Sequence, residues 1–372
     1  MTTNRAGAER ELPLAELCVI SLIVFALSVL LHSPFLVPNI YSDLNSVWAR
    51  PEIHSSHLPY VDYGFDYPAV VGWLLYASTR GDYGSYLAIQ GAALGLSLLG
   101  VVVALRKLSV STSDVLLYVV AAPTMLIYGF YNWDLIMVAF AFLAVVAFKL
   151  KRIAICGLLL GLSAATKVYS LVFVPILLTD IHSWRERGFL ALGCIAGWVL
   201  PNFPFMLLNF DGWFGTWIYY RNWGFEDTWL LLLSPTDHYN LFVKAFGFFL
   251  LALVLLRITF SSKPGATLNE RLLYAALTWL LFSYISTPQM VLFVLPLFAL
   301  NRIGYGAFYT SEISNALIIL TWFTTANPIA VEAAPQLLNL VRQGVWSLLL
   351  FGYLVPNWKD VLRWFKAPLV VP

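Results

Sequence analysis

A polar segment at residues 41–68, YSDLNSVWARPEIHSSHLPYVDYGFDYP, follows the first long apolar stretch of the chain. It carries four carboxylates, Asp43, Glu52, Asp62 and Asp66, among several aromatic residues. Only 11% of all residues are charged, so the chain has few places where carboxylates can stand in water. We therefore expect a functional site, or the rim of one, in this segment.

Further polar connections share its dense tryptophan and tyrosine content. They include YNWD at 131–134, the long segment 209–240, the break ISTPQ at 285–289, and 327–336. Part of this enrichment is the aromatic belt that membrane proteins place at the headgroup level. The remainder fits sugar recognition, in which aromatic faces cover C–H surfaces while carboxylates and amides accept hydrogen bonds from hydroxyls.

Lys167 lies between two short apolar segments, 153–166 and 168–180. A lysine at the bilayer centre costs on the order of 2.5 to 3.5 kcal/mol on insertion scales, so it either snorkels to the interface or meets an anion. Short helices that adjoin a charge usually line a polar cavity. We expect Lys167 to bind a phosphate, with snorkelling to lipid headgroups as the alternative.

The elements that must position these residues are membrane helices. Sixty per cent of the residues are hydrophobic, in apolar runs long enough to span a bilayer. The sequence thus predicts an all-α polytopic membrane protein with about twelve transmembrane helices. These are expected at 12–31, 84–105, 114–130, 135–149, 153–166, 168–180, 188–208, 239–257, 271–285, 289–300, 311–326 and 337–355.

The distribution of basic residues indicates the orientation. With these spans, 16 of the 22 Lys and Arg residues fall on one side and 6 on the other. The positive-inside rule then places both termini in the cytoplasm and the polar connections outside it. The segment from Tyr67 to Thr79 is too short to span, so we expect a helix in the outer interface. A net charge of +2 offers no basic face for a nucleic acid.

Several motifs occur in a characteristic order on one predicted side of the membrane. YSDL (41–44) is followed by LPY (58–60), DYP (66–68), GLLLGLSAATKVYSLVFVPILL (157–178) and FSYISTPQMVLFVLPL (282–297). Over residues 12–300, this order resembles integral-membrane glycosyltransferases of the GT-C fold. It is most similar to bacterial and archaeal polyprenyl-phosphate-mannose-dependent mannosyltransferases and to the catalytic subunit of GPI mannosyltransferase I.

The resemblance implies transfer of a hexose, with mannose favoured, from a polyprenyl or dolichyl phosphate carrier to a lipid or glycan acceptor. Such enzymes act on the extracytoplasmic face, usually with inversion. The expected organisation is one membrane domain over 1–372. It has a GT-C-like catalytic module at 12–238, a first loop at 33–83, and more variable helices at 239–372. A prokaryotic plasma membrane is favoured, and the endoplasmic reticulum is the alternative.

The resemblance also suggests roles for particular residues. Asp43 occupies the place of the first-loop aspartate and is the expected catalytic base, with helix capping as the alternative. Lys167, Arg221 and His238 are expected to bind the donor phosphate. The residues expected to bind substrate are Asp62, Asp66, Tyr67, Asn132, Asp134, Tyr169 and Gln289. The plainer interpretations are turn residues for Asp62 and Asp66 and a helix cap for Asn132 or Asp134.

One departure from the family concerns metal dependence. Several relatives carry paired acidic residues in the first loop, whereas this chain has YSDLN. We expect no cofactor. A divalent metal between Asp43 and Asp134 is the alternative, and nothing in the sequence specifies it. Two other functional classes remain open: a flippase or transporter of lipid-linked sugars, and a noncatalytic subunit of a membrane assembly. An inverted repeat would favour transport, and the sequence has none.

Overall fold

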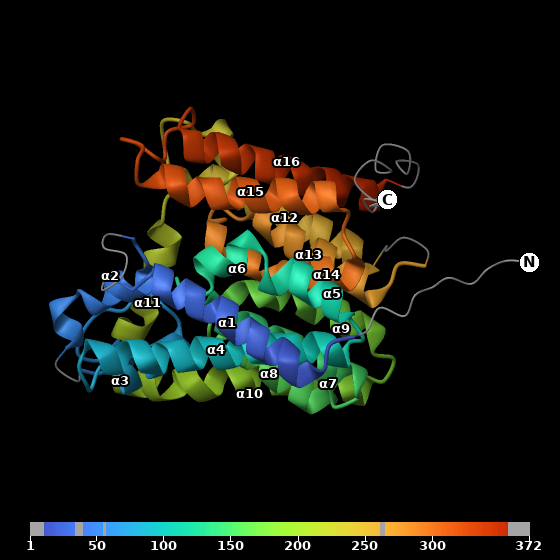
Figure 1. Ribbon diagram of the computed structural model, residues 1–372, viewed down its shortest axis with the longest axis horizontal. Helices are drawn as coiled ribbons and strands as arrows, with labels where there is room; N and C mark the ends of the chain where they lie inside the picture. Colours follow the sequence, from blue (N-terminus) through green and yellow to red (C-terminus); the bar gives the residue numbers. More distant parts are fainter. Residues whose placement is uncertain (1–10, 34–39, 55–56, 261–264, 356–372) are drawn as a thin grey trace, which may run out of the picture.

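The computed structural model describes residues 11–33, 40–54, 57–260 and 265–355, and these residues form helices and turns without a β-strand (Figure 1). The all-α prediction is confirmed. The terminal residues 1–10 and 356–372, on which the predicted cytoplasmic position of the termini depends, lie outside the described ranges.

Five helices are long and apolar enough to cross a membrane. They are α1 (Leu14–Leu31), α4 (Tyr83–Lys107), α10 (Trp184–Leu208), α12 (Leu241–Phe260) and α16 (Ala334–Leu354). Each coincides with one of the twelve expected spans. The chain is therefore a helical, membrane-embedded protein by the length and composition of its helices.

The other seven expected spans do not form a single helix that is both long and apolar enough. Prolines and polar residues account for much of this difference, because proline interrupts helical hydrogen bonding. Pro123 and Pro288 each begin a new helical segment within or beside an expected span, and α15 carries Glu312 and Asn315 in its interior. These segments consist of α5 (Thr112–Val115), the π-helix η2 (Leu116–Val120), α6 (Pro123–Tyr128), α7 (Asp134–Lys149), α8 (Ile153–Ala164), the 3-10 helix η3 (Val168–Val172), α9 (Phe173–Asp180), α13 (Leu268–Phe282), the 3-10 helix η5 (Pro288–Phe293), α14 (Leu295–Asn301) and α15 (Tyr305–Trp322).

Helix α7 is buried on all sides. Most of its residues are buried around its whole circumference, including Leu135, Val138 and Phe142, and it packs against α4 and α8. A helix that is apolar on every side is stable only when other helices surround it. Its N-terminal residue, Asp134, is thereby carried into the protein interior, where its side chain is fully buried.

Helices α8 and α10 pack with their backbones in close contact. Gly157 and Gly161 of α8 face Gly193 and Gly197 of α10, and a Cβ atom at any of the four would collide with the backbone of the partner helix. Two glycines four residues apart on each helix permit this approach, as in the GxxxG motif of membrane helices. The crossing fixes the position of α8, and Lys167 follows three residues after that helix ends.

The connections that carry the candidate residues gather at one end of the helices. Figure 1 shows α2 (Asp43–Trp48), α3 (Ala69–Ser78) and α11 (Phe210–Asn222) together at the left of the molecule. The short 3-10 helices η1 (Pro51–Ile53) and η4 (Trp229–Leu233) complete the helical elements of the described residues. The Thr216 hydroxyl of α11 donates to the carbonyl of Phe65 at 2.8 Å, so α11 supports the first loop. Residues 67–79, for which we expect a helix in the outer interface, contain the short helix α3, which is not one of the five long helices.

Candidate functional site

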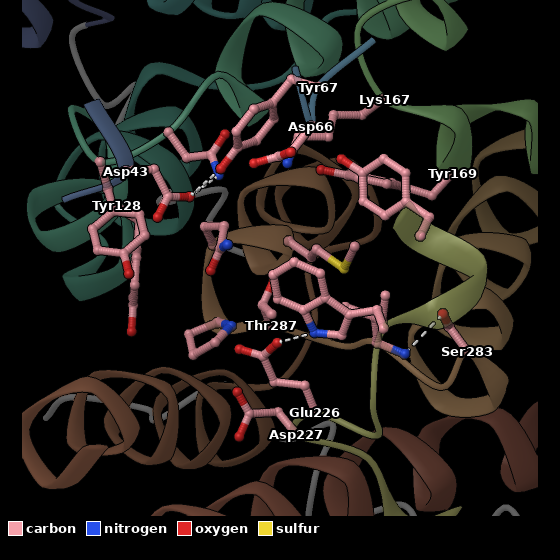
Figure 2. Close-up of a pocket in the computed structure, with 18 of the residues that line it drawn as sticks. Asp43, Asp66, Tyr67, Tyr128, Lys167, Tyr169, Glu226, Asp227, Ser283 and Thr287 are labelled. Atoms are coloured by element: carbon pink, nitrogen blue, oxygen red, sulfur yellow. Dashed lines mark hydrogen bonds between the residues drawn. The ribbon is translucent and has the colours of Figure 1, made fainter. Parts of the chain in front are cut away.

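A cavity of about 480 Å³, here called the main cavity, opens among these connections. Its walls include Asp43, Arg50, Asp66 and Tyr67 from the first loop, Asn132, Lys167 and Tyr169 from the middle of the chain, Trp217, Tyr220, Trp223 and Glu226 from α11 and beyond, and Thr287 and Gln289 at the helix break. Figure 2 shows several of these side chains converging. Segments more than 200 residues apart in the sequence thus share one hollow.

Asp43 lies at the first position of α2, and Ser42 is the N-cap, because the Ser42 hydroxyl accepts from the backbone N–H of Asn45 at 3.2 Å. The capping alternative for Asp43 is therefore wrong. Its Oδ2 atom instead accepts hydrogen bonds from the Tyr67 hydroxyl at 2.9 Å and from the Asn132 side-chain amide. These contacts fix the carboxylate on the cavity wall.

Burial is the main influence on the Asp43 carboxyl, and it raises the pKa of Asp43 above its ordinary value. The charge of Lys167 and the hydrogen bonds from Tyr67 and Tyr41 oppose this effect. A carboxylate with a raised pKa accepts a proton more readily than one in water, which suits a general base.

Lys167 also lines the main cavity, and its Nζ lies 3.3 Å from Asp134 Oδ2. The same Nζ lies 5.1 Å from the centre of the Tyr67 ring, a cation–π distance. Tyr169 donates its hydroxyl hydrogen bond to the other oxygen of Asp134. The anion that the sequence led us to expect beside Lys167 is thus first of all Asp134, which lies behind the cavity wall.

Asp66 lies on the cavity wall and pairs with Arg50 at 2.8 Å between Arg50 Nη2 and Asp66 Oδ2. Arg50 is not among the site residues expected from the sequence, although it lies in the same acidic segment. The cavity therefore has two cations, Arg50 and Lys167, each paired with an aspartate. Gln289 also lies on the wall, next to the Pro288 break that the sequence predicted.

Besides Asp134, which lies behind the wall, three of the expected site residues lie outside the main cavity. The carboxylate of Asp62 accepts from the backbone N–H of Leu58 at 2.6 Å, as expected for a turn residue. Arg221 lines a separate small hollow beside Lys244. His238 contributes its backbone carbonyl, which accepts from the N–H of Phe225 at 2.9 Å. None of the three lines the main cavity.

Glu226 and Asp227 line the main cavity, and neither is among the site residues expected from the sequence. In Figure 2 they lie across the cavity from Tyr67 and Lys167. The sequence does show these two residues as an adjacent acidic pair in the aromatic-rich segment 209–240, which could have marked them as candidate site residues. What the sequence does not show is the pairing that brings them there: the Glu226 N–H donates to the Tyr284 carbonyl at 3.1 Å, and the Ser286 N–H donates to the Glu226 carbonyl at 3.0 Å.

Both carboxyls of this pair have raised pKa values. Burial, followed by the charge of Asp227, raises the pKa of Glu226 to about 8, although a hydrogen bond from Trp223 and the charge of Lys167 oppose the shift. Burial raises the pKa of Asp227 to about 7, against the opposing effects of Arg342 and Gln336. The cavity thus contains carboxyls on opposite walls in different environments, an arrangement frequent at catalytic sites.

The break at residues 283–288 is held in place from behind. Arg342 of α16 is fully buried, and its Nη2 donates to the carbonyl of Ser286 at 2.7 Å. The side-chain amide of Asn315 in α15 donates to the carbonyl of Pro288 at 3.1 Å. Backbone carbonyls that a broken helix leaves unpaired are therefore satisfied by side chains of neighbouring helices. This support fixes Thr287 and Gln289 on the cavity wall.

Within the described ranges, no group of three or more His, Cys, Asp or Glu side chains is placed to hold a metal ion. Asp43 and Asp134, the pair considered from the sequence, have the separate hydrogen-bond and ion-pair partners given above.

No protein-family model matches this chain, and no curated protein matches it in sequence.

Proposed function

We propose that the protein is an integral-membrane glycosyltransferase of the GT-C type. It transfers a hexose, with mannose favoured, from a polyprenyl or dolichyl phosphate to a lipid or glycan acceptor, with inversion. The observation that carries this proposal is that Asp43 and Lys167, 124 residues apart, line the same cavity. A carboxylate and a cation in one aromatic-walled hollow are the groups that this reaction requires.

In the proposed reaction, an acceptor hydroxyl attacks the anomeric carbon from the face opposite the phosphate. Asp43 takes the hydroxyl proton as the new C–O bond forms. The bond between the anomeric carbon and the phosphate oxygen breaks, and the phosphate leaves with the electron pair. Lys167, with Arg50 as the second cation on the wall, stabilises the charge of the departing phosphate. Phosphate is a good leaving group, so the reaction does not need a general acid.

We also assign twelve membrane crossings by joining short helices that follow each other directly. In this assignment α5, η2 and α6 form one crossing, η3 and α9 a second, and η5 and α14 a third. Helices α1, α4, α7, α8, α10, α12, α13, α15 and α16 supply one crossing each. Non-helical backbone at membrane depth is tolerated where it lines a cavity, which supports this assignment for the breaks near Lys167 and Pro288.

The ends of α4 support an extracytoplasmic position for the main cavity. The hydroxyl of Tyr83, at the start of α4, donates to Asn45 in the first loop at 2.7 Å. Arg106 and Lys107 lie in the last turn of this 25-residue helix, on the order of 35 Å away at 1.5 Å per residue. Two basic residues thus lie at the end of α4 opposite the cavity, as the positive-inside rule predicts for a cytoplasmic face. A prokaryotic plasma membrane is the proposed location.

The test is turnover of a defined donor by the purified protein in detergent. Synthetic polyprenyl phosphomannose and a panel of lipid and glycan acceptors are supplied, and release of polyprenyl phosphate is measured. We expect release that depends on the acceptor and is abolished by Asp43→Asn in a protein that still elutes as a folded species. Undiminished release by the folded Asp43→Asn variant would remove Asp43 from the mechanism, and no release with any acceptor in the panel would refute the proposal.

A further inference from the structure

Glu226 is held rigidly on the wall of the main cavity. Its backbone pairs on both sides with the break at residues 284–286, as described above. Its Oε2 atom accepts a hydrogen bond from the indole N–H of Trp223 at 2.6 Å. The side chain is therefore positioned from two directions, and Trp223 is oriented by the same contact.

Trp223 is fixed independently. Its carbonyl accepts a hydrogen bond from Lys244 Nζ at 2.6 Å, and the Tyr219 ring packs edge-on against its indole with 5.0 Å between the ring centres. Tyr219 and Trp223 both line the main cavity. The wall around Glu226 is thus an aromatic surface into which the Glu226 carboxyl is set, with the carboxyl of Asp227 beside it.

The charges around Glu226 distinguish this wall from the one opposite. Asp66 forms an ion pair with Arg50, and the charge of Lys167 acts on Asp43. Glu226, in contrast, forms no ion pair among the described residues. The titratable groups that act on it are Asp227, Asp43 and Lys167, and its pKa of about 8 keeps the carboxyl largely protonated at neutral pH. A neutral carboxyl can donate one hydrogen bond and accept another.

Such a group suits a ligand with neutral hydroxyls and a C–H face. Aromatic rings cover the apolar face of a sugar ring, and a carboxyl that both donates and accepts can bind hydroxyls at its edge. A phosphate, in contrast, fits the opposite wall, where Lys167 and Arg50 lie.

We propose that Trp223 and Glu226 form the hexose-binding subsite of the main cavity, in which the Glu226 carboxyl hydrogen-bonds to hydroxyls of the transferred sugar. This inference rests on the proposed glycosyltransferase function and adds the residues that recognise the sugar. It assigns Glu226 to substrate selection and leaves proton abstraction to Asp43.

The test combines protein variants with modified donors. Polyprenyl phosphomannose and the corresponding 2-, 3-, 4- and 6-deoxy donors are compared with wild type, Glu226→Ala and Glu226→Gln, and kcat/KM is measured for each combination. Glu332→Gln is the matched control, because Glu332 is an exposed glutamate outside the cavity. Thermal unfolding in detergent establishes that each variant is folded.

We expect one deoxy donor to lose about 10-fold in kcat/KM with wild type, the size of one hydrogen bond. The kcat/KM of Glu226→Ala with the intact donor should be lower than that of wild type by about the same factor. Replacing the intact donor with that deoxy donor should lower the kcat/KM of Glu226→Ala little further, because the contact is already absent. Glu226→Gln, whose amide can still donate and accept, should retain most of the activity. Glu332→Gln should behave as wild type.

The enzyme could be active while Glu226→Ala and the deoxy donor lower kcat/KM by independent factors that multiply at every ring position. That result would overturn the subsite and leave the glycosyltransferase proposal intact. A wild type inactive with every donor would overturn both. The two failures are therefore distinguishable.

Discussion

Replacing Lys167 with methionine removes a charge that has a partner in the protein and, in the proposed reaction, a second partner in the substrate. Lys167 Nζ lies 3.3 Å from Asp134 Oδ2, and the Lys167 and Asp134 side chains are 11% and 0% exposed. At an effective dielectric constant near 20, two unit charges at this distance attract by about 5 kcal/mol before desolvation is counted. Removing one partner of a buried pair typically destabilises a protein by about 3–5 kcal/mol.

The double variant Lys167→Met/Asp134→Asn separates the structural role of Lys167 from its role toward the donor. The asparagine removes the unpaired buried charge but can still accept the hydrogen bond from Tyr169, so we expect it to recover most of the stability lost in Lys167→Met. The contact to the phosphate stays absent in both variants. A hydrogen bond to a charged group contributes about 1.5–3 kcal/mol, which corresponds to a rise of about 10- to 100-fold in the donor KM.

The assay is steady-state kinetics with the donor varied at saturating acceptor, together with thermal unfolding of each variant in the same detergent. Lys149→Met is the control, because Lys149 is an exposed lysine at the opposite end of α7. We expect a raised donor KM and an almost unchanged acceptor KM in both Lys167 variants. Recovery of the wild-type donor KM in the double variant would show that Lys167 serves only to neutralise Asp134, and would refute the phosphate assignment.

Three further predictions concern the base, the sugar-binding wall and the helix crossing. Asp43→Asn should lower kcat by about 10²- to 10⁴-fold without loss of folding, and a smaller loss in single-turnover assays would contradict general-base catalysis. Because Glu226 is protonated below its pKa of about 8 and ionised above it, wild-type activity should fall as pH rises through 8; Glu226→Gln should lack this alkaline decline, and an unchanged pH profile would count against the role of the proton. Gly197→Ala should lower the free energy of unfolding by about 1–3 kcal/mol, because its Cβ meets the α8 backbone. Gly344→Ala, whose Cβ meets no atom within 4 Å, is the control, and equal stability of the two would refute the close-contact argument.

Features that depend on local sequence could be predicted well. The Pro288 break follows from the missing N–H of proline, and the position of Lys167 between two short helices is visible in the apolar pattern. The glycines spaced by four before Lys167 lie within the motif at 157–178. Their physical role needs the second pair of glycines on α10, which the sequence alone does not place opposite them.

Features that depend on register or on distant pairing could not be predicted. A shift of one residue decides that Ser42 caps α2 and that Asp43 is free to accept from Tyr67. On α11 and its C-terminal end, Trp217, Tyr220 and Trp223 recur every three residues on the cavity wall, so Arg221 points away from it. Glu226 enters the cavity because its backbone pairs with residues 284–286, nearly 60 positions away, and no local pattern encodes that pairing.

The backbone pairing of Glu226 with residues 284–286 has a mechanical consequence. It ties the connection between α11 and α12 to the connection between α13 and η5, while Arg342 and Asn315 anchor the second of these to α15 and α16. The wall of the main cavity that these two connections form is therefore a single rigid unit. In the proposed reaction, widening of the main cavity for a bulky acceptor falls instead to the first loop. That loop is held to the remainder by separate hydrogen bonds, among them those from the backbone N–H groups of Leu44 and Val70 to the carbonyls of Tyr131 and Ala165.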